Sequence, residues 1–265
     1  MNSRFCQNYV AVIALGLMML VFGYAPVFAQ QQTLEEIVGA MKKSVVGVGT
    51  FQGIRQPQSL IMGTGFAVGD GLHIVTNHHV VADYMVPVDK EYLVVLIGRG
   101  QRFEPRQAEV IATEVLHDLA LLRITGEPLP AVKFSSRQIM AGEGREVALT
   151  GYPIGPVFGL FSVTHRGIVS AITPNLIPQA QARLLDADII RHQRFDIYQL
   201  DITAYPGNSG SPLYDAGTGD VIGILNSTFV KGTKERALTD PSGISFAIPV
   251  KYIYLLLDKV NVRTN

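Results

Sequence analysis

Short hydrophobic runs, separated by glycine, proline or charged residues, follow one another through most of this chain. Six runs rich in valine, isoleucine and leucine lie between residues 44 and 125, and a second series lies between residues 145 and 250. Runs of this length with turn residues at their ends are typical of β-strands. No helical pattern of about 10–15 residues alternates with them. The sequence therefore predicts a mostly antiparallel, all-β protein rather than a doubly wound parallel sheet.

The hydrophobic spacing becomes helical near the two ends of the strand-rich region. Thr33 precedes an amphipathic stretch, and Glu36 lies three residues after Thr33, which is the pattern of a capping box. We expect a short N-terminal helical segment within residues 30–43. Near the C-terminus, Pro249 precedes a second stretch with apolar residues at helical spacing, which predicts a helix over about 250–260.

The first 29 residues have a different composition from the rest. Arg4 is followed by an uninterrupted apolar run over residues 10–22, and small residues precede Ala29. A membrane-spanning helix needs about 20 apolar residues, so this run is short for one. The pattern predicts a cleaved signal peptide over residues 1–29 and an exported protein, periplasmic or secreted, with no stable membrane insertion after cleavage. The alternative is a membrane anchor through residues 10–22.

Composition narrows the classes of partner and cofactor. The 22 basic and 22 acidic residues balance, so we expect no nucleic-acid partner. Cys6 is the only cysteine and lies in the predicted leader, so the mature chain would have no disulfide. No cluster of histidines and cysteines and no acidic calcium loop occurs in the sequence. We therefore expect no metal and no organic cofactor.

One serine lies in an unusual context. Ser209 belongs to the stretch TAYPGNSGSPLYD, in which glycine and proline indicate a tight, irregular turn. Such a turn is either an ordinary surface loop or the support of a nucleophile, which would need a histidine base oriented by a carboxylate. His78 and His79 end a strand-like run, and Asp118 immediately precedes another. The chain order His, Asp, Ser is that of the chymotrypsin arrangement.

Six segments in the same order together resemble trypsin-like serine proteases of the HtrA/Deg type. They are GTGFAVGDGLHIVTNHHVV, HDLALLRI, VTHRGIVSAI, PGNSGSPL, DVIGILNST and GISFAIPV. The resemblance runs from about Ser44 to Lys251. It implies two six-stranded antiparallel β-barrels, with barrel one over about 44–130 and barrel two over about 140–250, in a protease domain covering 44–265. Many members carry a PDZ domain after the protease, and we expect none here.

The resemblance also assigns functions to individual residues. It implies His79 as the general base, with His78 at a variable position, Asp118 as the orienting acid and Ser209 as the nucleophile. The backbone N–H groups of Gly207 and Ser209 would form the oxyanion hole, with Asn208 shaping the loop. The residues that would line the substrate pocket are Thr203, Ala204, Leu225, Asn226 and Ser227. None of these is charged, so a small or medium apolar substrate residue is expected before the cut.

These assignments predict an exported serine endopeptidase that cleaves protein or peptide substrates, unfolded ones among them. The alternative is a non-catalytic peptide-binding or scaffold protein that retains the protease fold. A binding module does not require the three triad residues together, which favours the enzyme. The protein could also form a homo-oligomer, because a trimer is known among members of the family that it resembles.

Overall fold

The computed structural model describes residues 32–84, 90–153, 159–175, 194–226 and 243–264. The predicted leader, with its apolar run, and Ser227 lie outside the described residues. No helix in the described part of the chain is long and apolar enough to cross a membrane.

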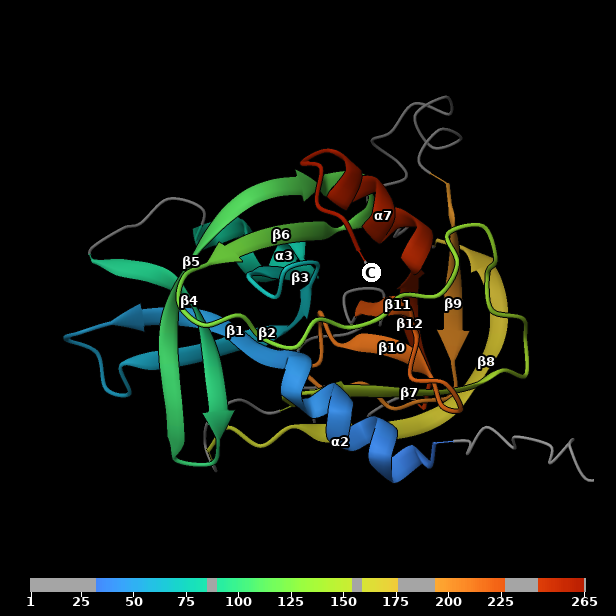
Figure 1. Cartoon of the computed structure of the whole chain (residues 1–265), viewed down its shortest axis with the longest axis horizontal. Helices are drawn as coiled ribbons and strands as arrows, with labels where there is room; N and C mark the ends of the chain where they lie inside the picture. The colour runs from blue at the N-terminus through green and yellow to red at the C-terminus, as the bar shows by residue number, and fades with distance from the viewer. Residues whose placement is uncertain (1–31, 85–89, 154–158, 176–193, 227–242, 265) are drawn as a thin grey trace, which may run out of the picture. The chain divides into compact units, whose positions relative to one another are not determined.

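The first six strands close into a barrel in the order β1-β2-β3-β6-β5-β4, and every neighbouring pair is antiparallel (Figure 1). Closure gives each strand two hydrogen-bonded neighbours and leaves no open sheet edge. The strands are β1 (Val45–Gln52), β2 (Ser59–Val68), β3 (His73–Asn77), β4 (Glu91–Arg99), β5 (Arg102–Glu114) and β6 (Leu119–Ile124).

The other six strands close into a second barrel in the order β10-β11-β12-β9-β8-β7, again antiparallel throughout. They are β7 (Glu146–Gly151), β8 (Val163–Pro174), β9 (Asp196–Leu200), β10 (Pro212–Asp215), β11 (Val221–Asn226) and β12 (Ser245–Pro249). The prediction of two six-stranded antiparallel barrels is therefore confirmed.

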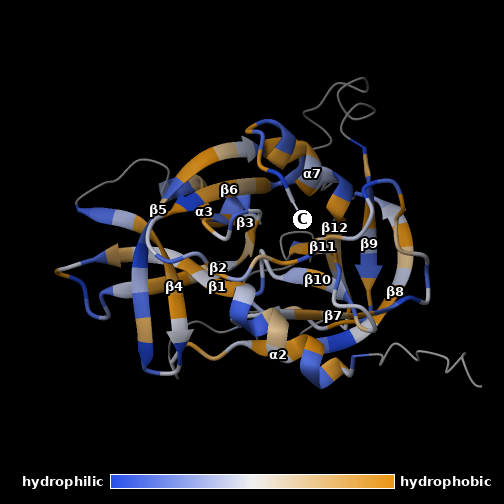
Figure 2. Cartoon of the chain, in the orientation of Figure 1, coloured by the Kyte–Doolittle hydropathy of each residue, from blue (hydrophilic) through white to orange (hydrophobic). Residues whose placement is uncertain are grey.

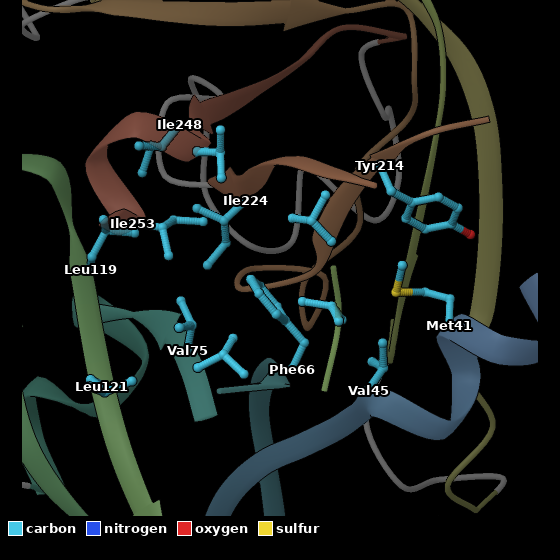
Figure 3. Close-up of a cluster of buried hydrophobic side chains, with 14 of the residues drawn as sticks. Met41, Val45, Phe66, Val75, Leu119, Leu121, Tyr214, Ile224, Ile248 and Ile253 are labelled. Atoms are coloured by element: carbon cyan, nitrogen blue, oxygen red, sulfur yellow. The ribbon is translucent and has the colours of Figure 1, made fainter. Parts of the chain in front are cut away.

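Neighbouring residues of strand β3 belong to two different hydrophobic clusters. In β3, Ile74 belongs to a cluster made only of barrel-one elements, whereas its neighbour Val75 belongs to a cluster that contains side chains from both barrels. Successive strand residues point to opposite faces, so each of the two contacts a different set of neighbours. Figure 3 shows Val75 and Phe66 of barrel one near Ile224 of barrel two. Because both faces are covered, β3 is buried along its whole length.

Two helices have the positions that the hydrophobic spacing predicts. Helix α2 (Leu34–Ser44) begins with a capping box between Thr33 and Glu36, which satisfies N–H groups that the first helical turn leaves unpaired. Its buried Met41 packs in the cluster that includes Tyr214 of barrel two (Figure 3). Hydrophobic and hydrophilic residues alternate along α2 in Figure 2. This is expected of a helix that buries one face and exposes the other.

Helix α7 (Val250–Asp258) follows β12 directly and buries most of its residues. The segment between β6 and β7 contains no long strand and joins the two barrels. Within this segment, Arg137 forms an ion pair with Asp258 at 2.7 Å, and its guanidinium lies 4.2 Å from the ring centre of Tyr254. The link between the barrels is thus attached to the C-terminal helix.

Candidate active site

A histidine and an aspartate meet just beyond the ends of two paired strands. β3 and β6 are antiparallel, and Asn77 at the end of β3 pairs with Leu119 at the start of β6. The short helix α3 (His78–Val81) therefore begins beside the residue that precedes β6, which is Asp118. This register explains why two side chains 39 residues apart in the sequence are neighbours.

The carboxylate of Asp118 is held against His79 from two sides. Nδ1 of His79 lies 2.5 Å from Oδ2 of Asp118, and the backbone N–H of His79 donates to Oδ1 at 2.8 Å. The N–H of His78 and the side-chain amide of Asn77 both donate to the Asp118 carbonyl, at 3.0 and 3.1 Å. Asp118 has φ of 49°, a left-handed conformation that is uncommon outside glycine and that Asp adopts more readily than most residues. Backbone and side chain of Asp118 are both fixed.

A third group reaches Asp118 from the other barrel. The side-chain amide of Asn226, at the end of β11, donates to Oδ2 of Asp118 at 2.7 Å. Asn226 is completely buried. The resemblance assigns Asn226 to the substrate pocket, and in the structure its side-chain amide contacts the Asp118 carboxylate. No pattern in the sequence signals that contact, because it depends on how the two barrels meet.

The serine lies on the far side of the histidine ring. Nε2 of His79 is 3.0 Å from Oγ of Ser209. With a proton on Nδ1, facing the Asp118 carboxylate, Nε2 has a free lone pair and accepts from the serine hydroxyl. The side chain of His79 is 31% exposed, so it is accessible from solvent. The structure thus brings His79, Asp118 and Ser209 together, whereas His78 contacts Asp118 through its backbone N–H.

Glycines shape the turn that carries Ser209. Gly207 and Gly210 have φ of 97° and 87°. A β-carbon on Gly210 would lie 1.9 Å from the backbone oxygen of Thr64, so only glycine fits that position. The N–H of Asn208 donates to the carbonyl of Tyr205 at 3.0 Å, which closes a tight turn just before the serine.

The predicted oxyanion-hole residues lie in this turn. Among the described residues, no partner accepts a hydrogen bond from the N–H of Gly207. A donor without a partner beside the serine is available to a substrate oxygen. The side chain of Asn208 is buried and makes no hydrogen bond within the described part of the chain.

The remaining predicted pocket residues lie on the segments that flank the serine. Ala204 and Leu225 are buried in the barrel-two cluster, and Thr203 is partly exposed. Asp201, the nearest acid, accepts a hydrogen bond from the N–H of Ile168 at 2.6 Å and is therefore committed to the backbone of β8. No group of three or more His, Cys, Asp or Glu side chains suited to a metal occurs among the described residues.

Comparisons with known proteins show which family the chain resembles. Residues 63–224 match the family model described as trypsin-like peptidase domain. The chain is 32% identical over 199 residues to a probable periplasmic serine endoprotease, DegP-like, of Pseudomonas fluorescens, and 31% identical over 206 residues to a protein of the same description from Chlamydia trachomatis. These matches cover 75% and 77% of this chain but only 35% of each relative. The chain thus spans about a third of the length of these relatives.

Solved structures share the fold. The HtrA-type protease AlgW with tripeptide superimposes with a TM-score of 0.61 at 24% identity, covering 86% of this chain and 64% of AlgW. The serine endoprotease from Yersinia pestis gives a TM-score of 0.58 at 23% identity, with 86% and 66% covered. At this identity the likeness concerns the fold alone.

Proposed function

This chain belongs to the family of trypsin-like peptidase domains, and we propose that it is a serine endopeptidase whose catalytic triad is His79, Asp118 and Ser209. The observation that carries the proposal is the continuous chain of contacts from the Asp118 carboxylate through the imidazole to the serine hydroxyl, at 2.5 and 3.0 Å. A serine hydroxyl is a weak nucleophile until a neighbouring base accepts its proton, and this arrangement supplies the base and its orienting acid.

In the proposed first step, the oxygen of Ser209 bonds to the carbonyl carbon of the scissile peptide while its proton moves to Nε2 of His79. Asp118 stabilises the resulting imidazolium through the Nδ1 proton, which stays on the ring. His79 then donates its proton to the departing amine, and the acyl group remains on Ser209. Water attacks this ester in the reverse sequence of proton transfers, which releases the acid and restores the serine.

Negative charge on the substrate oxygen would be stabilised by the N–H groups of Gly207 and Ser209, since fixed donors in a partly dehydrated site favour the oxyanion over the neutral carbonyl. Among the described residues, the pocket would be lined by Thr203, Ala204 and Leu225. None is charged, and Asp201 is engaged by the backbone of β8. A small or medium apolar residue before the cleaved bond suits such a pocket.

A non-catalytic binding protein with the same fold is the alternative. The purified mature chain is incubated with casein beside Ser209→Ala, which removes one oxygen from the proposed nucleophile. Cleavage by the parent and its loss in the variant, by about 10⁴-fold or more, supports the enzyme. Peptide binding without any cleavage by the parent would support the binding module instead.

We also propose that the protein is exported, since the matched relatives are named periplasmic. N-terminal sequencing of the exported form should begin at Gln30, within a residue or two. A membrane-bound product that retains Met1 would instead support an anchor at residues 10–22. Whether the protein is a homo-oligomer is measured directly by analytical ultracentrifugation.

A further inference from the structure

One buried threonine connects the turn of Ser209 to both barrels. Thr64 lies in β2 and is completely buried. Its hydroxyl donates to the carbonyl of Gly207 at 2.8 Å, and the same oxygen accepts the N–H of Tyr152 at 3.0 Å. The backbone N–H of Thr64 donates to the carbonyl of Ser209 at 2.8 Å. Three segments distant in the sequence thus meet at one side chain.

The hydroxyl of Thr64 both donates and accepts a hydrogen bond in this arrangement. A hydroxyl has one proton to donate, and Gly207 receives it. A lone pair accepts from Tyr152, the residue that follows β7. The backbone of Thr64 is itself fixed, because the hydroxyl of Thr76 donates to its carbonyl at 2.8 Å. Neither a rotation of the side chain nor a shift of β2 can occur without breaking one of these contacts.

The Gly207 carbonyl is a sensitive point in the turn. It belongs to the peptide that joins Gly207 to Asn208, between the N–H groups of Gly207 and Ser209. Glycine tolerates many backbone conformations, so the turn has little intrinsic preference for the one in which Gly207 has φ of 97°. Within the turn, the Asn208 N–H at the other end of this peptide donates to the Tyr205 carbonyl at 3.0 Å. The Thr64 hydroxyl adds a second hydrogen bond from outside the turn, so the peptide plane is held at both ends.

We propose that Thr64 is a positioning residue for the oxyanion hole: its hydroxyl holds the Gly207 carbonyl and so aims the N–H groups on either side of that peptide at the substrate oxygen. The inference rests on the proposed peptidase function. It adds a residue of barrel one, remote in the sequence from the serine, to the determinants of transition-state binding.

Thr64→Val tests this directly, because valine has nearly the same shape and lacks the hydroxyl. Thr64→Ser is the conservative variant that keeps it. Thr150→Val is the matched control: Thr150 is also completely buried, and its hydroxyl pairs with Thr164 and Tyr214 at 2.9 and 2.8 Å, away from the turn. All are compared on a fluorogenic peptide with an apolar residue before the cut, and with a peptide aldehyde, whose adduct with the serine places an oxyanion in the hole.

For Thr64→Val, kcat should fall roughly 10- to 100-fold while KM changes little, because misplaced donors lose transition-state binding and leave substrate binding intact. Aldehyde affinity should fall by a similar factor. Thr64→Ser should retain both. Thr150→Val should lower the melting temperature and leave kcat unchanged. If Thr64→Val fails to fold, Thr64→Ala is judged by the same criteria.

Three results would overturn the inference: kcat within twofold of the parent in Thr64→Val, equal impairment in Thr64→Ser, or an equal loss of kcat in Thr150→Val. A parent protein that neither cleaves the peptide nor binds the aldehyde would instead contradict the proposed peptidase function. The two failures are therefore distinguishable.

Discussion

Two histidine–carboxylate pairs lie at opposite ends of strand β3 in barrel one. His73 opens β3 and its Nδ1 lies 2.7 Å from Oδ1 of Asp70; His79 follows β3 and its Nδ1 lies 2.5 Å from Oδ2 of Asp118. By this distance alone the pairs are equivalent. A carboxylate that orients an imidazole is therefore insufficient to identify a catalytic base.

The difference lies at the second ring nitrogen. Nε2 of His79 faces the hydroxyl of Ser209 at 3.0 Å, whereas Nη1 of Arg123 lies 3.0 Å from Nε2 of His73 and 3.0 Å from Asp70. The guanidinium of Arg123 keeps its protons in a protein, so it is not a nucleophile that His73 could activate. Arg123 instead ties β6 to the turn before β3. The side chain of His73 is 11% exposed and that of His79 is 31% exposed. The first pair stabilises the fold, and the second is accessible to a substrate.

The largest expected effect separates the two histidines. His79→Gln should reduce peptidase turnover by about 10⁴-fold, since His79 is the base that the described residues place at the hydroxyl of Ser209. His73→Gln should leave turnover within about twofold, because its contacts are structural. Initial rates on casein, with melting temperatures to verify folding, measure both. Equal losses in the two variants would mean that the observed effect reports folding and not proton transfer.

The sequence alone predicts much of this picture. Strand-length runs predict an all-β protein and the capping box at Thr33 predicts α2, because both depend on local spacing. The two six-stranded barrels are implied by the resemblance of the motifs to trypsin-like proteases. The order of His79, Asp118 and Ser209 within recognisable motifs identifies the candidate triad. The sequence does not predict the contacts between the two barrels. The bond from Asn226 to Asp118, like that from Thr64 to Gly207, depends on how closed barrels approach each other, which no local pattern encodes.

The two carboxylates provide the second test. Asp118→Asn should lower kcat by about 10³- to 10⁴-fold, because an amide favours the wrong tautomer of His79 and cannot stabilise the imidazolium. Asp70→Asn should change stability and leave kcat intact. Steady-state kinetics on the fluorogenic peptide, measured for both variants, distinguishes the two outcomes. Retention of most activity in Asp118→Asn would remove this residue from the proposed triad.

Asn226→Ala should have an intermediate effect that shows which function this residue has. Loss of one hydrogen bond to a charged group, worth about 1.5–3 kcal/mol, predicts a kcat roughly 10- to 100-fold lower with KM nearly unchanged. A residue that lines the substrate pocket would instead alter KM and the preferred residue before the cut. Measuring kcat and KM separately over a panel of peptides therefore shows whether Asn226 acts by holding Asp118 or by lining the substrate pocket.

The smallest expected effect concerns His117, which precedes Asp118. Burial lowers the pKa of His117; Glu114 opposes the shift, and Lys259 and Lys251 add to it. The ring of His117 also stacks on that of Tyr252, with centroids 4.0 Å apart.

Below about pH 6.5 the unfolded chain binds a proton at this histidine that the folded chain resists, so stability should decline as pH falls through that value toward the lower folded pKa. His117→Phe keeps an aromatic ring and removes the titration. Urea unfolding from pH 7.5 to 5.5 should show a shallower decline in the variant. Identical declines would mean that His117 titrates alike in both states.

The most direct test of the central claim is to find where a fluorophosphonate probe reacts. Such a probe phosphonylates a serine only when a base activates it, and mass spectrometry of the digested protein locates the adduct. The account predicts an adduct on Ser209 in the parent and in His73→Gln, with labelling strongly slowed in His79→Gln and absent in Ser209→Ala. An adduct on a different serine, or labelling of Ser209 at an undiminished rate in His79→Gln, would contradict it.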